Sequence, residues 1–156
     1  MEQVNGNHHL TMSVGPAQED YDFHTRALGM RSIKKTVLFD GQAPIYHLYY
    51  GNADGTASSV LTTFPFRQAG VMGRRGTNQV KVINLAVPEG SLPFWEGRLA
   101  DHGIVAERSS LLGTERLASP TRAASPTRWW RWRATPGPAT RAAGSARTPR
   151  STAATA

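Results

Sequence analysis

The sequence predicts an α+β fold, in which one βαβββ module is followed by an incomplete second copy and by a disordered tail. Several short runs alternate apolar with polar residues and are bounded by Gly, Pro, Asn or Asp, which is typical of strands. The order strand, helix, strand at the start recurs after residue 79, which indicates an internal duplication. The 156 residues are enough for one domain with a core and few for two.

The first expected strand covers residues 7–14, where Leu10, Met12 and Val14 alternate with polar residues. His9 and Thr11 therefore project from the same face, roughly 6.5 to 7 Å apart between Cα atoms, close enough to line one small pocket. An imidazole there can bind a metal through one nitrogen while the protein holds the other. The alternatives are a solvated strand end or a hydrogen-bonded structural histidine, which are the commoner roles for such a His-His pair.

One helix and three strands complete the expected first module, residues 5–66. The helix is expected over residues 17–28, with Pro16 in its first turn and Gly29 in a left-handed conformation at its end. The three strands are expected at residues 30–39, 44–50 and 59–64, separated by turns rich in Gly, Asn and Asp.

A partial repeat of this order follows a Gly- and Arg-rich linker, residues 67–79. Residues 80–116 contain an expected strand at 80–87, a helix at 91–102 with Ser91 as N-cap, and a strand beginning at 104. An incomplete module leaves an open sheet edge and uncovered apolar residues, so we expect self-association. The apolar residues concerned include Phe94, Trp95, Ile104 and Leu111.

The net positive charge comes entirely from residues 117–156. The chain has 18 Lys and Arg against 11 Asp and Glu, and this segment holds seven of the Arg and none of the acidic residues. The remaining 11 basic residues balance the 11 acidic ones. A nucleic-acid-binding function would rest on the tail alone, so the sequence disfavours it.

The tail is predicted to be disordered, because Ala, Arg, Pro, Ser, Thr and Gly dominate it without a period that could build a core. An arginine- and tryptophan-containing arm for phosphate or a membrane interface is one interpretation. We favour another. Codons for residues 129–133, read from one base earlier, encode an apolar strand, so we predict a frameshifted translation. The nucleotide sequence around codons 110–120 tests this prediction.

Composition excludes several classes. The sequence has no run of about 18 apolar residues and its start lacks the features of a secretory signal, so we expect a cytoplasmic protein without membrane partners. It has no Cys, which excludes disulfides and thiolate chemistry. A metal would be bound by His, Asp or Glu.

Five runs of consecutive residues resemble the N-terminal part of hydroquinone-type ring-cleaving dioxygenases. These enzymes belong to the vicinal oxygen chelate superfamily, together with glyoxalase I and bleomycin-resistance proteins. The resemblance covers about residues 5–116, and the five runs are residues 8–11, 27–31, 34–40, 46–51 and 61–66. It implies βαβββ modules whose curved sheets enclose a non-haem Fe(II), or sometimes Mn(II), held by two His and one Glu. Open coordination positions would take an aromatic diol and O2.

Carried over by position, the resemblance makes His9 the first metal ligand. It makes His8 and Thr11 substrate-binding residues that could hydrogen-bond a phenolic oxygen. A 2-His-1-carboxylate site leaves adjacent positions for substrate and O2. The second His and the Glu come from the C-terminal half of the family's chain, so we expect this chain to be an inactive N-terminal fragment, and we assign it no catalytic residue. The alternative is a metal-free, small-molecule-binding or glyoxalase-like module that forms a homo-oligomer to complete its cup.

The other histidines have structural interpretations. His47 lies in an aromatic strand with Tyr46, Tyr49 and Tyr50, where packing and hydrogen bonding are commoner than metal binding. His24 and His102 lie on expected helices and are predicted to be exposed to solvent.

Overall fold

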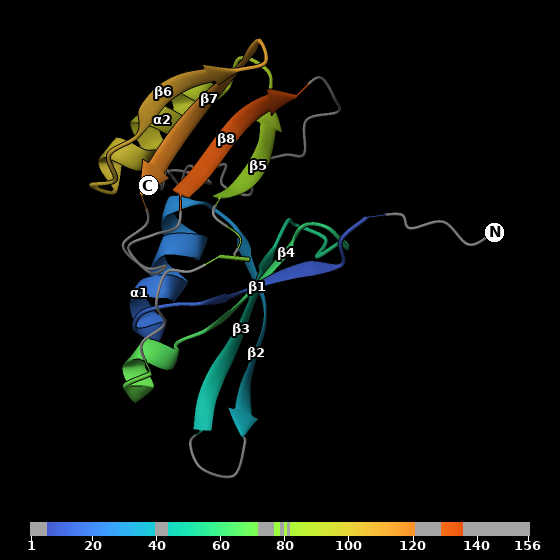
Figure 1. The fold of residues 1–156 in the computed structure, drawn as a ribbon, viewed down its shortest axis with the longest axis vertical. Helices are drawn as coiled ribbons and strands as arrows, with labels where there is room; N and C mark the ends of the chain where they lie inside the picture. Colours follow the sequence, from blue (N-terminus) through green and yellow to red (C-terminus); the bar gives the residue numbers. More distant parts are fainter. Residues whose placement is uncertain are drawn as a thin grey trace, which may run out of the picture.

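The computed structural model describes residues 6–39, 44–71, 77, 78, 80, 82–120 and 129–135, the last segment by its backbone alone. They form two four-stranded mixed sheets, each with a helix on one face (Figure 1). In the view of Figure 1 the second sheet lies above the first. The α+β class and the βαβββ module predicted from the sequence are confirmed.

The first module has the strand order β1-β4-β3-β2, with β1 and β4 parallel and the other pairs antiparallel. Its elements are β1 (His9–Ser13), α1 (Ala17–Asp22), the π-helical segment η1 (Phe23–Ala27), β2 (Arg31–Phe39), β3 (Pro44–Gly51) and β4 (Val60–Phe64). A short 3-10 helix, η2 (Phe66–Ala69), follows.

The second module repeats this arrangement, with the order β5-β8-β7-β6 and with β5 parallel to β8. Its elements are β5 (Val82–Pro88), α2 (Leu92–Asp101), β6 (Glu107–Leu111), β7 (Thr114–Pro120) and β8 (Trp129–Thr135). In Figure 1, α2 lies behind the β6–β8 part of the sheet.

The second module therefore differs from the prediction, which made it incomplete and assigned no regular structure to residues 117–156. β7 extends to Pro120, and β8 pairs with both β5 and β7. Trp and Arg alternate from Trp130 to Arg133, and aromatic residues favour strands, so a pairing partner on each side outweighs the polar composition of the segment. The predictions for residues 121–128 and 136–156 lie outside the described residues, and the frameshift stays a prediction.

The first helix covers the expected residues but changes its hydrogen-bond pattern halfway. The amide of Leu28 donates to the carbonyl oxygen of Phe23, five residues earlier, which is the π-helical spacing. Gly29 then adopts a φ of +66° and ends the helix, as predicted. Ser91 lies at the N-cap position of α2, but its hydroxyl donates to the carbonyl of Pro88 at 2.6 Å and makes no capping bond.

One hydrophobic core joins the two modules. Met12 and Val14 of β1 are 1% and 0% exposed, and they belong to the same cluster as residues of the second module. The cluster comprises Met12, Val14, Leu28, Leu61, Ile83, Val87, Leu92, Trp95, Leu99 and Leu117. Of the apolar residues expected to drive self-association, Trp95 is buried in this core, whereas Phe94 and Leu111 are exposed. No described helix combines the length and the apolar character that crossing a membrane requires.

Arg98 of α2 also links the modules. Its Nε donates to the carbonyl oxygen of Ala27 at 2.7 Å, and its Nη2 donates to that of Arg26 at 2.6 Å. These carbonyls lie at the end of η1, where a helix has acceptors without intrahelical partners and where positive charge is favourable. One guanidinium therefore caps the first module's helix from the second module.

We predict that Arg98→Ala lowers the free energy of unfolding by about 1 to 3 kcal/mol, because it removes two hydrogen bonds from a charged group. Denaturant unfolding of the purified chain measures the change. Arg108→Ala is the control, because it removes an exposed ion pair with Glu96 within the second module and should change stability little. Equal stability of the two variants would contradict a linking role for Arg98.

Candidate functional site

The exposed face of β1 carries the predicted site residues. His9 and Thr11 are both exposed and share one face, while Leu10 and Met12 point to the other, as the alternation predicted. Nδ1 of His8 lies 2.9 Å from Nδ1 of His9, and the two rings meet edge to face with centroids 5.2 Å apart. Because a hydrogen bond needs one donor and one acceptor, at least one of these imidazoles is neutral in this arrangement.

Thr11 is held by the neighbouring strand. The parallel register of β1 and β4 places Thr11 opposite Thr62, and their Oγ1 atoms are hydrogen-bonded at 2.8 Å. The Thr62 side chain is fully buried, whereas Thr11 is reachable from solvent. Thr62 thus limits the directions in which the Thr11 hydroxyl can point.

The same sheet face continues onto β3 with an aromatic and imidazole pair. Tyr49 is the cross-strand partner of Thr62, and its Oη lies 2.9 Å from Nδ1 of His47. The His47 ring stacks on Phe64 with centroids 4.0 Å apart and planes inclined by 23°. His47 is therefore packed and hydrogen-bonded, as its sequence context indicated.

The electrostatics of this face favour a neutral His47. Burial lowers the pKa of His47 below its usual value of 6.5, and the charges of His9 and Lys34 lower it further. His47 is consequently an uncharged hydrogen-bonding ring at neutral pH.

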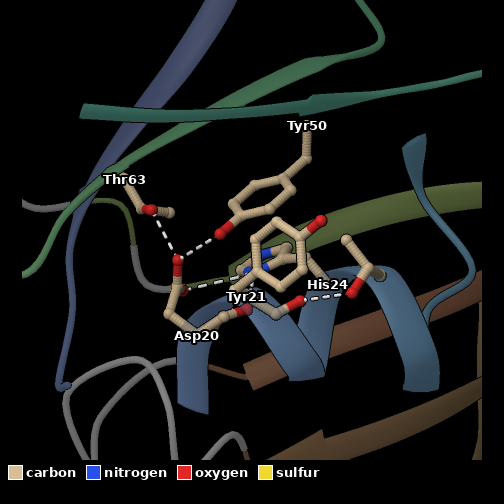
Figure 2. Close-up of polar contacts among 6 residues, drawn as sticks. Asp20, Tyr21, His24, Tyr50 and Thr63 are labelled. Atoms are coloured by element: carbon tan, nitrogen blue, oxygen red, sulfur yellow. Dashed lines mark hydrogen bonds and ion pairs between the residues drawn. The ribbon is translucent and has the colours of Figure 1, made fainter. Parts of the chain in front are cut away.

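The opposite face of the sheet holds a buried polar cluster that the sequence did not reveal. Oδ2 of Asp20 accepts hydrogen bonds from Oη of Tyr50 at 2.8 Å and from Oγ1 of Thr63 at 2.5 Å (Figure 2). Burial, and then the carboxylate, raise the pKa of Tyr50, so its hydroxyl stays a donor. Asp20, Tyr50 and Thr63 are each 0% exposed, so Oδ2 of this carboxylate is satisfied by protein groups, whereas the buried Oδ1 accepts no hydrogen bond from the described residues and has only Nδ1 of His24 at 3.2 Å.

His24 belongs to this cluster, and its predicted exposure was wrong. It is 1% exposed, and its ring stacks on Tyr50 with centroids 4.3 Å apart. Its Nδ1 donates to the main-chain oxygen of Asp20 at 2.9 Å and lies 3.2 Å from Oδ1 of the same residue. Tertiary contacts with β3 thus outweigh the polar character that suggested a surface position. His102 is exposed, as predicted.

The donor set does not complete a 2-His-1-carboxylate site among the described residues, because no three His, Asp or Glu side chains converge there. The second module does not supply a further histidine on its corresponding strand, β5. Ile83, Leu85 and Val87 repeat the apolar phase of β1, so Val82 and Asn84 lie on the opposite face of β5. In the described part of the chain, His9 of β1 therefore has no histidine counterpart on β5.

Two hollows lie elsewhere. A cleft of about 880 Å³ between the modules is lined by the other face of β1, including Leu10, and by Ile83 and Trp95. A second, of about 470 Å³, lies beside α1 between Tyr21 and Tyr46. Neither is lined by His8, His9 or Thr11, so the candidate site is an open sheet face.

Proteins of known structure share this fold. A Bacillus subtilis protein described as a dioxygenase superposes with a TM-score of 0.73 and 31% identity, over 86% of this chain and 42% of its own. A glyoxylase/bleomycin resistance protein/dioxygenase domain from Frankia superposes with a TM-score of 0.62 and 15% identity, over 85% of this chain and 93% of its own. The fosfomycin resistance protein FosX of Listeria monocytogenes, solved with Mn(II) and sulfate, gives 0.59 and 9% over 85% of this chain and 94% of its own.

Curated relatives are similar in sequence over part of their length. The chlorohydroquinone/hydroquinone 1,2-dioxygenase of Sphingobium indicum is 41% identical over 118 residues, which are 75% of this chain and 37% of the relative. MhqE of Bacillus subtilis, described as a ring-cleaving dioxygenase, is 39% identical over 115 residues, which are 74% of this chain and 37% of the relative. No protein-family model matches the chain.

The two modules and these structural neighbours define the class: the chain has the vicinal oxygen chelate fold. Within that class its sequence is related to the N-terminal part of the hydroquinone-type ring-cleaving dioxygenases. The chain spans little more than a third of the length of these curated relatives.

We predict that His47 titrates below 6.5 and that His9→Ala raises its pKa, because one of the charges that oppose protonation is removed. Burial, the larger cause, remains, so the rise is partial. Titration of the His47 ring protons by NMR measures both values, with His102→Ala as the control. Since the unfolded chain binds this proton more readily, His47 makes stability fall as the pH drops below about 6.5. An unchanged His47 pKa in His9→Ala would contradict the assigned proximity.

Proposed function

We propose that this chain supplies the first metal ligand and part of the diol-binding surface of a ring-cleaving dioxygenase. The observation that carries the proposal is the placement of His9 and Thr11 side by side on the exposed face of β1, in the segment that is similar to the named dioxygenases. His9 is the proposed ligand, and His8 and Thr11 are the proposed substrate-binding residues. Fe(II), with Mn(II) as the alternative, and an aromatic diol with O2 are the proposed metal and substrates.

The chemistry of these groups suits that role. A neutral imidazole offers a nitrogen lone pair to a divalent metal, and a second imidazole and a hydroxyl beside it can hydrogen-bond phenolic oxygens. The hydroxyl of Thr11 is already directed by Thr62. The described residues contribute one of the three ligands, so we derive no ring-cleavage step for this chain by itself. The cytoplasmic location and the absence of nucleic-acid partners remain sequence-based predictions.

The second candidate is a metal-free, small-molecule-binding module of the same superfamily that completes its cup by dimerisation. One observation favours it: this chain spans 93% of the Frankia domain, so its two modules match a protein of similar size. Sedimentation together with a metal-free hydroquinone titration of the purified chain separates the candidates. A stable dimer that binds hydroquinone without metal supports the second one.

We predict that the chain consumes no O2 with hydroquinone or catechol, even after anaerobic addition of Fe(II), because a single imidazole holds the metal too weakly. An oxygen electrode measures the rate. The positive experiment is a chimera in which this chain's aligned segment replaces that of the Sphingobium indicum dioxygenase. The chimera should consume O2, and His9→Ala should abolish both its activity and its metal content.

Glu107→Gln in the chimera is the matched control, because Glu107 is exposed on β6 in the second module and should leave both readouts unchanged. An active chimera that keeps its metal after His9→Ala would overturn the ligand assignment. O2 consumption by the chain alone would overturn the incomplete site.

A further inference from the structure

A single carboxylate oxygen ties together the two strands that neighbour Thr11. Oδ2 of Asp20 accepts the hydroxyl of Thr63 on β4 and that of Tyr50 on β3 (Figure 2). Both strands are central in their sheet, and β4 is the direct neighbour of β1. The position of α1 is therefore coupled to two strands at one atom.

The residues next to these two contacts face the candidate site. Adjacent strand residues project to opposite faces, so the neighbour of Thr63 is Thr62 on the site side, and the neighbour of Tyr50 is Tyr49. Thr62 is bonded to Thr11 and is also the cross-strand partner of Tyr49. A contact that fixes Thr63 and Tyr50 on the helix-covered face of the sheet therefore also fixes Thr62, which holds Thr11 on the opposite face.

We propose that Asp20 is a positioning residue for the Thr11 hydroxyl, acting through Thr63 and Thr62. This proposal rests on the proposed function, in which Thr11 binds a phenolic oxygen. Asp20 lies on the helix-covered face and reaches the substrate surface only through β4. Its contribution is to hold that strand at one height and tilt, so that Thr62 presents its hydroxyl to Thr11.

A conservative substitution of Asp20 follows from these contacts. Because both hydroxyls donate to the same oxygen, Asp20→Asn can keep both bonds with its amide oxygen. Its amide nitrogen then takes the place of Oδ1 and faces the Nδ1–H of His24, so the variant keeps the two contacts with the strands and loses the attraction to His24. Asp20→Ala removes both bonds. Thr63→Val and Tyr50→Phe each remove one donor with nearly unchanged shape, so they test the contact where Asp20→Ala fails to fold.

The first measurement needs no ligand. Methyl NMR of the full chain, labelled at Thr, should show a displaced Thr11 signal in Thr63→Val and in Asp20→Ala, and a wild-type signal in Asp20→Asn. Leu99→Val is the control, because it removes packing from the core without touching the cluster and should leave the Thr11 signal in place. An unchanged Thr11 signal in Thr63→Val, or an equal displacement in Leu99→Val, would overturn the positioning role.

The second measurement is a hydroquinone titration of the Sphingobium indicum chimera carrying the same variants. The affinity for hydroquinone should fall about tenfold in Thr63→Val, because the displaced Thr11 hydroxyl loses its one hydrogen bond to the phenolic oxygen. It should stay within about twofold of the unsubstituted chimera in Asp20→Asn. Equal affinity of the unsubstituted chimera and its Thr63→Val variant would count against the proposal. Absence of hydroquinone binding by the unsubstituted chimera would remove the proposed function, whereas the methyl comparison of the full chain would still decide whether Asp20 positions Thr11.

Discussion

The structure depends on the two-faced character of β1 and β4. Met12 and Leu61 face a core shared with the second module, while His9 and Thr11 face solvent. A shift of one residue in the register would bury the imidazole and expose the core residues, so the core specifies the register strongly. The buried carboxylate of Asp20 adds a polar contact that only the correct register satisfies, since Thr63 must face α1. The packing of the opposite face of the sheet thus determines where the site residues lie.

Much of this arrangement could be predicted from the sequence. The alternation around His9 gave the correct faces of β1, and the positive φ of Gly29 ended the first helix where expected. These features depend on neighbours along the chain, which a sequence displays. The burial of His24 could not be predicted, because it depends on Tyr50, a residue of another strand. The strand β8 was missed for a similar reason: composition indicated disorder, whereas pairing with β5 and β7 depends on the tertiary fold.

The duplication makes the asymmetry of the two modules informative. Both have the same strand order and a parallel outer pair, yet β5 contains no His, whereas β1 carries His9. The repeat therefore preserves the scaffold and changes the chemistry. Arg98 and the joint core bind the second module to the first, which gives the second module a supporting role for the sheet that carries the candidate site.

The central claim is that the metal-binding nitrogen of this chain is that of His9, on the open face of β1. Paramagnetic line broadening during a titration with Mn(II) tests it most directly, because it locates even weak metal binding without requiring activity. The account predicts that the amide signals of His9, Thr11 and Val60 broaden first, and that His9→Ala removes this effect. Broadening centred on His24 or His102, or persistence of the pattern in His9→Ala, would contradict it.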